Sequence, residues 1–371
     1  MSSRADPALR EKSRDDVADA FVRERAHSTS RLRSSAPNKW LCRFTWLLAS
    51  LTLLLICSGG MVTSKGVGLA VPDWPTTFGY NMFMFPVSKW VGGIFFEHTH
   101  RLIASTIGFL TIILAIWLWR AEPRKWMRML GLAALGAVIL QGVLGGLRVT
   151  MLKDEIGIFH ACLAQAFLGL LVFTAVAQSR VWHNAKGQLS NALVRLPIAT
   201  TIAIYVQLAL GATMRHQHRD LSILDFPTAY GAWIPDTSAQ HLAAINTWRD
   251  ARALSDVTAG QVWLQVAHRG VAVLILCGVF AYVAALHRRP DAGDRTLRTL
   301  SHIWMVGVLA QVTLGAWVIW SNKAADIATT HVAVGAIMLS LGVAICAIAL
   351  RLRAVDAAAQ TPVAQEAAHA F

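Results

Sequence analysis

Apolar residues dominate the chain in long runs, and polar residues gather between the runs. Eight runs are long enough to cross a bilayer as helices, which takes roughly 20 residues each. They lie near residues 41–63, 94–119, 126–147, 156–179, 193–214, 261–286, 299–320 and 326–350. Only 15% of the residues are charged, too few for the surface of a soluble domain of this length. The pattern therefore predicts an all-α integral membrane protein with eight transmembrane helices.

The chain carries one unusual loop motif twice, as "PDWPTTFG" at 72–79 and "LDFPTAYG" at 224–231. Each copy precedes three helices that also match in order. The first of these holds a His-Arg pair, in "EHTHR" and "VAHRG". The second holds a Gln followed by Leu-Gly, in "QGVLGG" and "QVTLGA", and the third opens with a His, in "FHACLA" and "THVAVG". Four crossings return the chain to its starting side, so the repeat predicts two four-helix bundles in parallel orientation.

This repeat sets the expected domain organisation. Residues 41–190 form the N-terminal half and residues 191–353 form the C-terminal half. Residues 1–40 are polar, basic and Ser-rich without an apolar core, so they are interpreted as a disordered cytoplasmic tail and not a secretory signal. The Ala-rich segment 354–371 is expected to be a second cytoplasmic tail.

A net charge of +13 raises the question of a nucleic-acid partner, and the distribution of charge answers it. Of the 34 Lys and Arg residues, 23 fall on one side of the eight crossings and nine fall on the other. This asymmetry is the positive-inside pattern, which places both termini in the cytoplasm. The basic surplus orients the protein in its membrane, and no nucleic-acid partner is expected.

Each half holds one His near the outer start of its second helix and one near the outer start of its fourth: His100 and His160, then His268 and His331. Ionisable groups inside a bilayer are costly, so they suggest a functional site. Two imidazoles that face each other across a four-helix bundle can ligate a haem iron from both sides. Zinc is the alternative metal, but two His without Cys or a nearby Asp leave tetrahedral coordination incomplete. A hydrogen bond to a neighbouring carbonyl is the structural alternative for each His.

Other histidines are expected to have lesser roles. His98 lies on the opposite helix face from His100 and is interpreted as structural. His216, His218 and His241 lie in the long outer loop and are expected to be solvated.

The two halves differ at one position of chemical interest. Glu97 lies one turn before His100, whereas the matching residue before His268 is Gln265. A partly desolvated carboxylate at this position is suited to proton transfer. The alternative role for Glu97 is an ion pair with Arg101. Four arginines near the outer helix ends, Arg101, Arg148, Arg215 and Arg269, are candidate partners for haem propionates, or they extend to the interface.

The four histidines, Glu97 and the duplicated four-helix half together resemble the heme A synthase family, over about residues 41–350. The resemblance implies oxidation of the ring methyl of haem O to the formyl group of haem A, for terminal oxidase biogenesis. It assigns His100 and His160 to the substrate haem O, Glu97 to catalysis, and His268 and His331 to a haem b cofactor. Many members carry a cysteine pair in an outer loop, whereas all five cysteines here lie in or at the edge of the spans.

The resemblance also implies a setting and partners. It places the chain in the cell inner membrane, with a haem O synthase as donor, an electron-transfer partner, and homo-oligomers as one arrangement. Two other classes stay open, a bis-His di-haem cytochrome b for electron transfer and a haem-binding assembly chaperone. The repeated loops are expected to cover their own halves as lids, or to lie in the interfacial aromatic belt.

Overall fold

The computed structural model describes residues 38–185, 189–217, 221–288 and 295–368, with side chains described as far as residue 353. Eight of its helices are long and apolar enough to span a membrane, which confirms the predicted fold class. In chain order these are α2 (Lys39–Ser64), α3 (Gly92–Ala121), α4 (Lys125–Met151), α5 (Asp154–Gln178), α7 (Asn191–His216), α9 (Ala259–His287), α10 (Arg295–Trp320) and α11 (Ala325–Ala368). Within α11 the apolar span is Ala325–Arg353.

Short elements lie between the spans. The loop after α2 contains two 3₁₀ turns, η1 (Met82–Met84) and η2 (Val87–Lys89), and α6 (Arg180–His183) links α5 to α7. The long loop after α7 contains α8 (Ala239–Asp250), a helix that the hydrophobic pattern did not predict. Its residues are too polar to form a span. The N-cap residue Ser238 is a sequence signal for the start of a helix and could have predicted α8.

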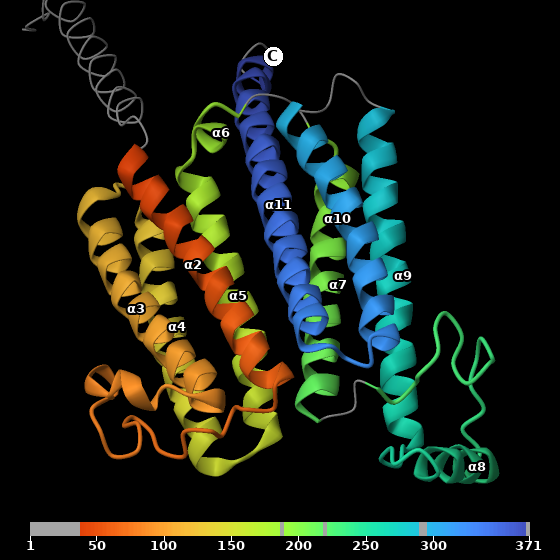
Figure 1. Ribbon diagram of the computed structural model, residues 1–371. Helices are drawn as coiled ribbons and strands as arrows, with labels where there is room; N and C mark the ends of the chain where they lie inside the picture. Colours follow the sequence, from red (N-terminus) through yellow and green to blue (C-terminus); the bar gives the residue numbers. More distant parts are fainter. Residues whose placement is uncertain (1–37, 186–188, 218–220, 289–294, 369–371) are drawn as a thin grey trace, which may run out of the picture. The chain divides into compact units, whose positions relative to one another are not determined.

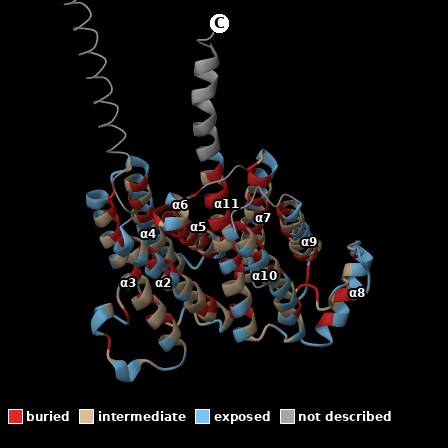
Figure 2. Ribbon diagram, turned by 90° about the horizontal axis from the view of Figure 1, so that it is seen from above, coloured by how far each residue is buried: buried red, intermediate tan, exposed pale blue. Residues whose placement is uncertain are grey.

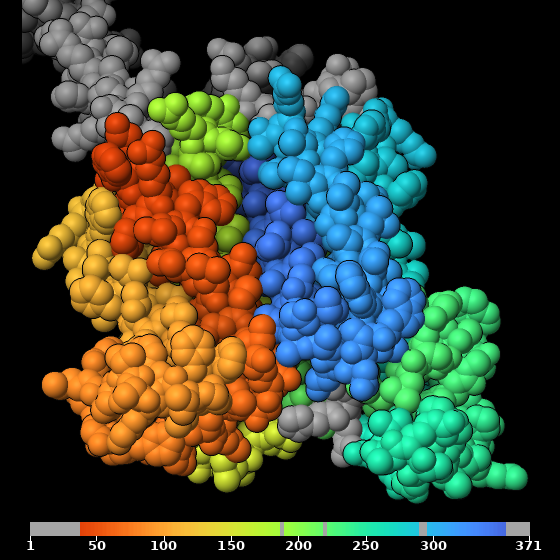
Figure 3. Space-filling model, in the orientation of Figure 1, coloured from red at the N-terminus to blue at the C-terminus, as the bar shows by residue number. Residues whose placement is uncertain are grey.

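The helices pack as two groups, α2–α5 and α7–α11, that meet along α5, α7 and α11 (Figures 1 and 2). The span of α11 is 56% buried, compared with 17% for α4 and α10, so α11 lies at the centre of the bundle. Figure 3 shows α11, in blue, in contact with both groups. Large apolar side chains such as Leu171, Ile345 and Trp304 fill the shared core. This arrangement fits the two predicted four-helix halves.

The predicted N-terminal tail, residues 1–40, lies outside the described residues except for its last three positions, and there the prediction was wrong for Lys39 and Trp40, which already belong to α2. The backbone of α11 stays helical through most of the predicted C-terminal tail and ends at Ala368. The division at residues 190 and 353 stays a prediction, as does the cytoplasmic side of both termini.

The two halves differ in how their first and second helices approach each other. The backbones of α7 and α9 pack closely, with Thr200 so near Gly278 that a β-carbon there would lie 2.6 Å from the threonine Oγ1. Between α2 and α3, the rings of Phe44 and Trp117 are in contact, with centroids 5.6 Å apart, and Gly59 lies against His100. The residues that match Thr200 and Gly278 in the N-terminal half are leucines, Leu48 and Leu110, so the threonine–glycine contact has no counterpart there.

This difference gives a stability prediction. Gly278→Ala should lower the free energy of unfolding in detergent by about 1–3 kcal/mol, because the added methyl meets Thr200 in a packed interface. Gly270→Ala on the same helix is the matched control, since no atom lies within 4 Å of its β-carbon position. An equal response of the two variants in a thermal unfolding assay would contradict the close packing of α7 on α9.

Candidate functional site

The four predicted histidines occupy equivalent places in the two halves. His100 and His268 lie on α3 and α9, and His160 and His331 lie on α5 and α11. Each residue as a whole is partly exposed, although the helices around it are closely packed. In both halves the backbone carbonyl of the second His, His160 or His331, accepts a hydrogen bond of 2.9 Å from the glutamine of the preceding helix. The Gln motif in the repeat therefore fixes the helix turn that carries the His.

A glycine on a neighbouring helix lies against each imidazole. A β-carbon at Gly59 or Gly145 would lie 2.9 or 3.2 Å from Cε1 of His100 or His160. In the C-terminal half, Gly211 and Gly315 hold the same positions, with distances of 3.4 and 3.2 Å to Cε1 of His268 and His331, respectively. A larger residue at Gly59, Gly145 or Gly315 would push the ring aside, whereas Gly211 is in ordinary van der Waals contact with His268. The three closer glycines therefore help to set where the imidazoles lie. Sequence reasoning missed them, although Gly145 and Gly315 are both in the quoted repeat, four residues after its Gln.

The imidazoles also share an unusual environment. Nδ1 of all four is buried without a well-aligned hydrogen bond among the described residues, although the backbone carbonyls of Gln141, Gln207 and Gln311 lie close to His160, His268 and His331. An imidazole that ligates iron through one ring nitrogen commonly turns its other nitrogen toward a carbonyl, so the arrangement is compatible with axial ligation. Among the described residues, no group of three or more His, Cys, Asp or Glu is placed to hold a metal ion. The donor set therefore suits a haem, which needs two axial ligands, and does not suit a tetrahedral ion.

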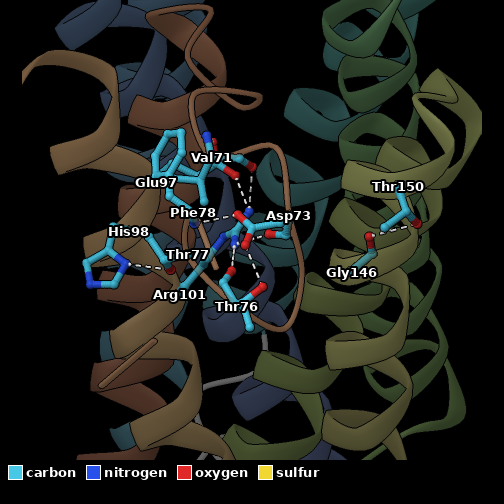
Figure 4. Close-up of polar contacts among 10 residues, drawn as sticks. All are labelled: Val71, Asp73, Thr76, Thr77, Phe78, Glu97, His98, Arg101, Gly146 and Thr150. Atoms are coloured by element: carbon cyan, nitrogen blue, oxygen red, sulfur yellow. Dashed lines mark hydrogen bonds and ion pairs between the residues drawn. The ribbon is translucent and has the colours of Figure 1, made fainter. Parts of the chain in front are cut away.

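The repeated loops have nearly identical hydrogen bonding. The carboxylate of Asp73 accepts from Phe78 N at 2.7 Å and from the Thr76 hydroxyl at 2.5 Å (Figure 4). It also accepts from Gly79 N at 2.9 Å. Asp225 accepts from Tyr230 N at 2.7 Å, Gly231 N at 3.0 Å and the Thr228 hydroxyl at 2.7 Å. Each aspartate thus closes its own loop, which explains why the motif keeps Asp, Thr and Gly in fixed order.

An arginine fastens each loop to the helix that carries the first His. Arg101 donates to the carbonyls of Val71, Asp73 and Thr76 at 2.6–3.1 Å (Figure 4). Arg269 donates in the same way to the carbonyls of Asp225, Pro227 and Thr228. Both guanidinium groups therefore bind the loops in this structure, and their role toward propionates stays a prediction.

The loops also contact the helices below them. The indole of Trp74 lies against Gly146 of α4, next to Gly145, and the ring of Phe226 lies 6.1 Å from that of Trp320 at the end of α10. Trp74 is 44% exposed, so one side of it also faces outward. These contacts fit the expectation of lids.

Glu97 and Gln265 occupy equivalent positions but make different contacts. The Glu97 carboxylate is buried; it accepts from Val71 N at 2.9 Å and from Arg101 at 2.7 Å (Figure 4). The Gln265 amide accepts from Ile223 N at 2.8 Å and donates to Ile223 O at 3.2 Å. Both side chains hold the loop, but only Glu97 brings a buried negative charge. The ion pair with Arg101, which was the alternative role for Glu97, is therefore present.

The other two predicted arginines lie at the outer helix ends. Arg148, in the last turn of α4, lies beside Gly68 of the first loop and Gly157 of α5. Arg215, in the last turn of α7, donates to Gly60 O at 2.5 Å and to the Ser64 hydroxyl, both on α2. It therefore reaches from the C-terminal half to the N-terminal half.

Among the described residues, two of the remaining histidines are buried. His98 is fully buried, contacts the Thr77 hydroxyl through Nδ1 at 3.2 Å, and packs against Phe85 and Trp90, as expected for a structural residue. The expectation that His216 is solvated was wrong. It is the last residue of α7, is 7% exposed and lies against Gly157, because α7 continues further outward than the apolar run suggested. His241 is exposed, and His218 lies outside the described residues.

Fold and site together define a polytopic membrane protein with one pair of inward-lying histidines in each of two similar helix groups. The family model of the cytochrome oxidase assembly protein (COX15-CtaA) matches residues 80–343, and the chain belongs to this family, as the resemblance to heme A synthase predicted. A protein from Shouchella clausii named Heme A synthase is 28% identical over 63% of this chain and 79% of its own length. Relatives of the same name from Geobacillus kaustophilus and Bacillus licheniformis are 26% and 24% identical over 79% and 77% of this chain, and over 85% and 88% of their own length.

The loop geometry predicts a pH response. Burial alone would raise the pKa of the Asp73 carboxyl, but hydrogen bonds from Gly79, Thr76 and Phe78 lower it below the ordinary value of 3.8. Because the pKa of Asp73 is lower in the folded state, its ionised carboxylate contributes fully to stability when the pH is above the ordinary pKa. That contribution is lost as the pH falls through the lowered pKa of the folded state. We expect amide hydrogen exchange at Phe78 and Gly79, corrected for its intrinsic rate, to accelerate on acidification below pH 3.8.

Asp73→Asn provides the companion measurement at neutral pH. It removes the charge that accepts these bonds, so exchange at Phe78 and Gly79 should accelerate while exchange at Tyr230 and Gly231 in the other loop stays unchanged. Equal exchange in wild type and variant would show that Asp73 does not hold the loop closed.

Proposed function

We propose that this chain is a heme A synthase that oxidises the ring methyl of haem O to the formyl group of haem A, for terminal oxidase biogenesis. The single observation that carries the proposal is the set of four imidazoles with buried Nδ1 atoms at equivalent places in the two halves, beside a carboxylate in only one half. Membership of the family and the names of the relatives support the same activity.

We assign the substrate to the N-terminal half and the cofactor to the C-terminal half. His100 and His160 would hold haem O, and His268 and His331 would hold a haem b that accepts electrons when bound. One difference between the halves supports this direction. Among the described residues, only the N-terminal half has a carboxylate at the site, at Glu97.

Glu97 would act through its charge. Val71 N and Arg101 hold the two carboxylate oxygens, and each oxygen keeps a second lone pair. The carboxylate is therefore oriented before the substrate arrives, and it can accept a proton or stabilise positive charge that develops on the substrate. The lid loop above it would limit the access of water.

The setting of the reaction forms part of the proposal. The chain would lie in the cell inner membrane with both termini in the cytoplasm and the lid loops on the outer side. A haem O synthase would supply the substrate, an electron-transfer partner would reoxidise the haem b, and the chain would form homo-oligomers or act alone. The halves would divide at residues 41–190 and 191–353.

The activity is tested by extracting haems from cells that supply haem O, with and without this chain, and identifying them by mass spectrometry. Haem A or its hydroxylated precursor should appear only with the chain. Glu97→Gln should lower product by about 100-fold, a usual effect of losing one proton-transfer group. Because Gln265 holds its loop without a charge, a glutamine at position 97 should also hold Val71, and the loss would reflect chemistry.

Controls separate chemistry from loop anchoring. Glu97→Ala removes both functions of Glu97, whereas Gln265→Ala removes only a loop anchor, in the other half, and should cost far less product. Full product from Glu97→Ala would refute the role of Glu97. Bound haem without modified haem in any sample would favour the electron-transfer cytochrome or the chaperone.

The glycine contacts give a second prediction. Gly145→Ala should displace the His160 ring and lower the low-spin haem absorbance of the N-terminal half, because its β-carbon would lie 3.2 Å from Cε1. Gly142→Ala on the same helix, with no atom within 4 Å of its β-carbon position, is the control and should bind haem as wild type does. Identical spectra for both variants would argue against a haem at His160.

A further inference from the structure

The outer ends of α2 and α7 each contact the opposite half. The hydroxyl of Ser64, the last residue of α2, lies 3.2 Å from that of Thr329 on α11, two residues before His331. His216, the last residue of α7, lies against Gly157 on α5, three residues before His160. Ser64 and His216 are 152 residues apart, the same offset as that of the two loop aspartates. Each half therefore supports the ligand-bearing fourth helix of the other.

Arg215 adds a polar link that has no counterpart in the repeat, since the matching residue on α2 is Thr63. Its guanidinium donates to Gly60 O at 2.5 Å and to the Ser64 hydroxyl. Gly60 follows Gly59, which lies against His100, and a β-carbon at Gly60 would lie 3.2 Å from Cγ2 of Thr329. One short segment of α2, residues 59–64, therefore contacts a ligand of the N-terminal site, the helix turn before a ligand of the C-terminal site, and Arg215.

We propose that Arg215 is a positioning residue that couples the two haem sites, by holding α2 residues 59–64 in the place where Gly59 seats His100. Charge-assisted hydrogen bonds are stronger than neutral ones, and a helix end without them is freer to shift. The loss of a side chain from the C-terminal half would then weaken haem binding in the N-terminal half. If haem in the C-terminal half strengthens this contact, linkage requires that haem in the N-terminal half strengthens haem binding in the C-terminal half by the same factor. The inference rests on the proposed haem sites.

The test uses the whole chain with His268→Ala and His331→Ala, so that only the N-terminal half can bind haem through two histidines. Titration with haem O, followed by low-spin absorbance, gives its dissociation constant. Adding Arg215→Gln should weaken binding about tenfold, the effect of losing one or two hydrogen bonds from a charged group. Ser64→Ala should weaken binding in the same direction by a smaller factor, and Arg215→Lys should restore part of the affinity. Arg252→Gln, which removes an exposed arginine beyond α8, is the matched control and should have no effect.

An affinity within twofold of the parent for Arg215→Gln would overturn the proposal, because Arg215 would then act only within its own half. If the parent binds no haem O although it is folded, the proposed substrate site itself fails, and this inference fails with it. If the histidine variants do not fold, a measurement without haem on the chain with all four histidines tests the same contact. Amide hydrogen exchange of residues 59–64 in the otherwise unchanged chain should accelerate on Arg215→Gln and not on Arg252→Gln, and equal exchange would again overturn the proposal.

Discussion

Four imidazoles with buried ring nitrogens, at equivalent places in the two halves, are the constraint on which the rest of the structure depends. Placing polar rings inside a membrane helix bundle is costly, and here the cost recurs at the same place in each half. The surrounding features serve these rings. Glycines on neighbouring helices make room for them, glutamines fix the helix turns that carry two of them, and arginines fasten a loop beside the other two.

The sequence repeat explains why the two halves share one architecture. The positions at which the halves differ support the proposal that one binds the substrate and the other the cofactor. Glu97 replaces a neutral amide, and Leu48 and Leu110 replace a threonine and a glycine. The first change adds a buried charge, and the second puts larger side chains where Thr200 meets Gly278 in the other half. Arg215 is a third departure, and it connects the halves. A protein that treats two similar haems differently needs differences of this kind, because identical sites would bind and react alike.

Much of this could be predicted from the sequence, because the signals were periodic and duplicated. Eight apolar runs predicted eight spans, and two matched sets of residues predicted the positions of the histidines and loops. Contacts between segments far apart in the chain could not be predicted in this way. The hydrogen bond from Arg215 to Gly60 and the burial of His216 depend on how the halves pack, and helix α8 lacks the apolar length of a span.

The proposed assignment places one haem between two histidines in each half. Electron paramagnetic resonance of the oxidised protein, purified from cells that supply haem O, tests this assignment together with a measured haem-to-protein ratio. Two haems per chain with two low-spin signals are expected, of which one disappears with His160→Ala and the other with His331→Ala. A single haem per chain, or high-spin signals that no histidine replacement removes, would contradict it.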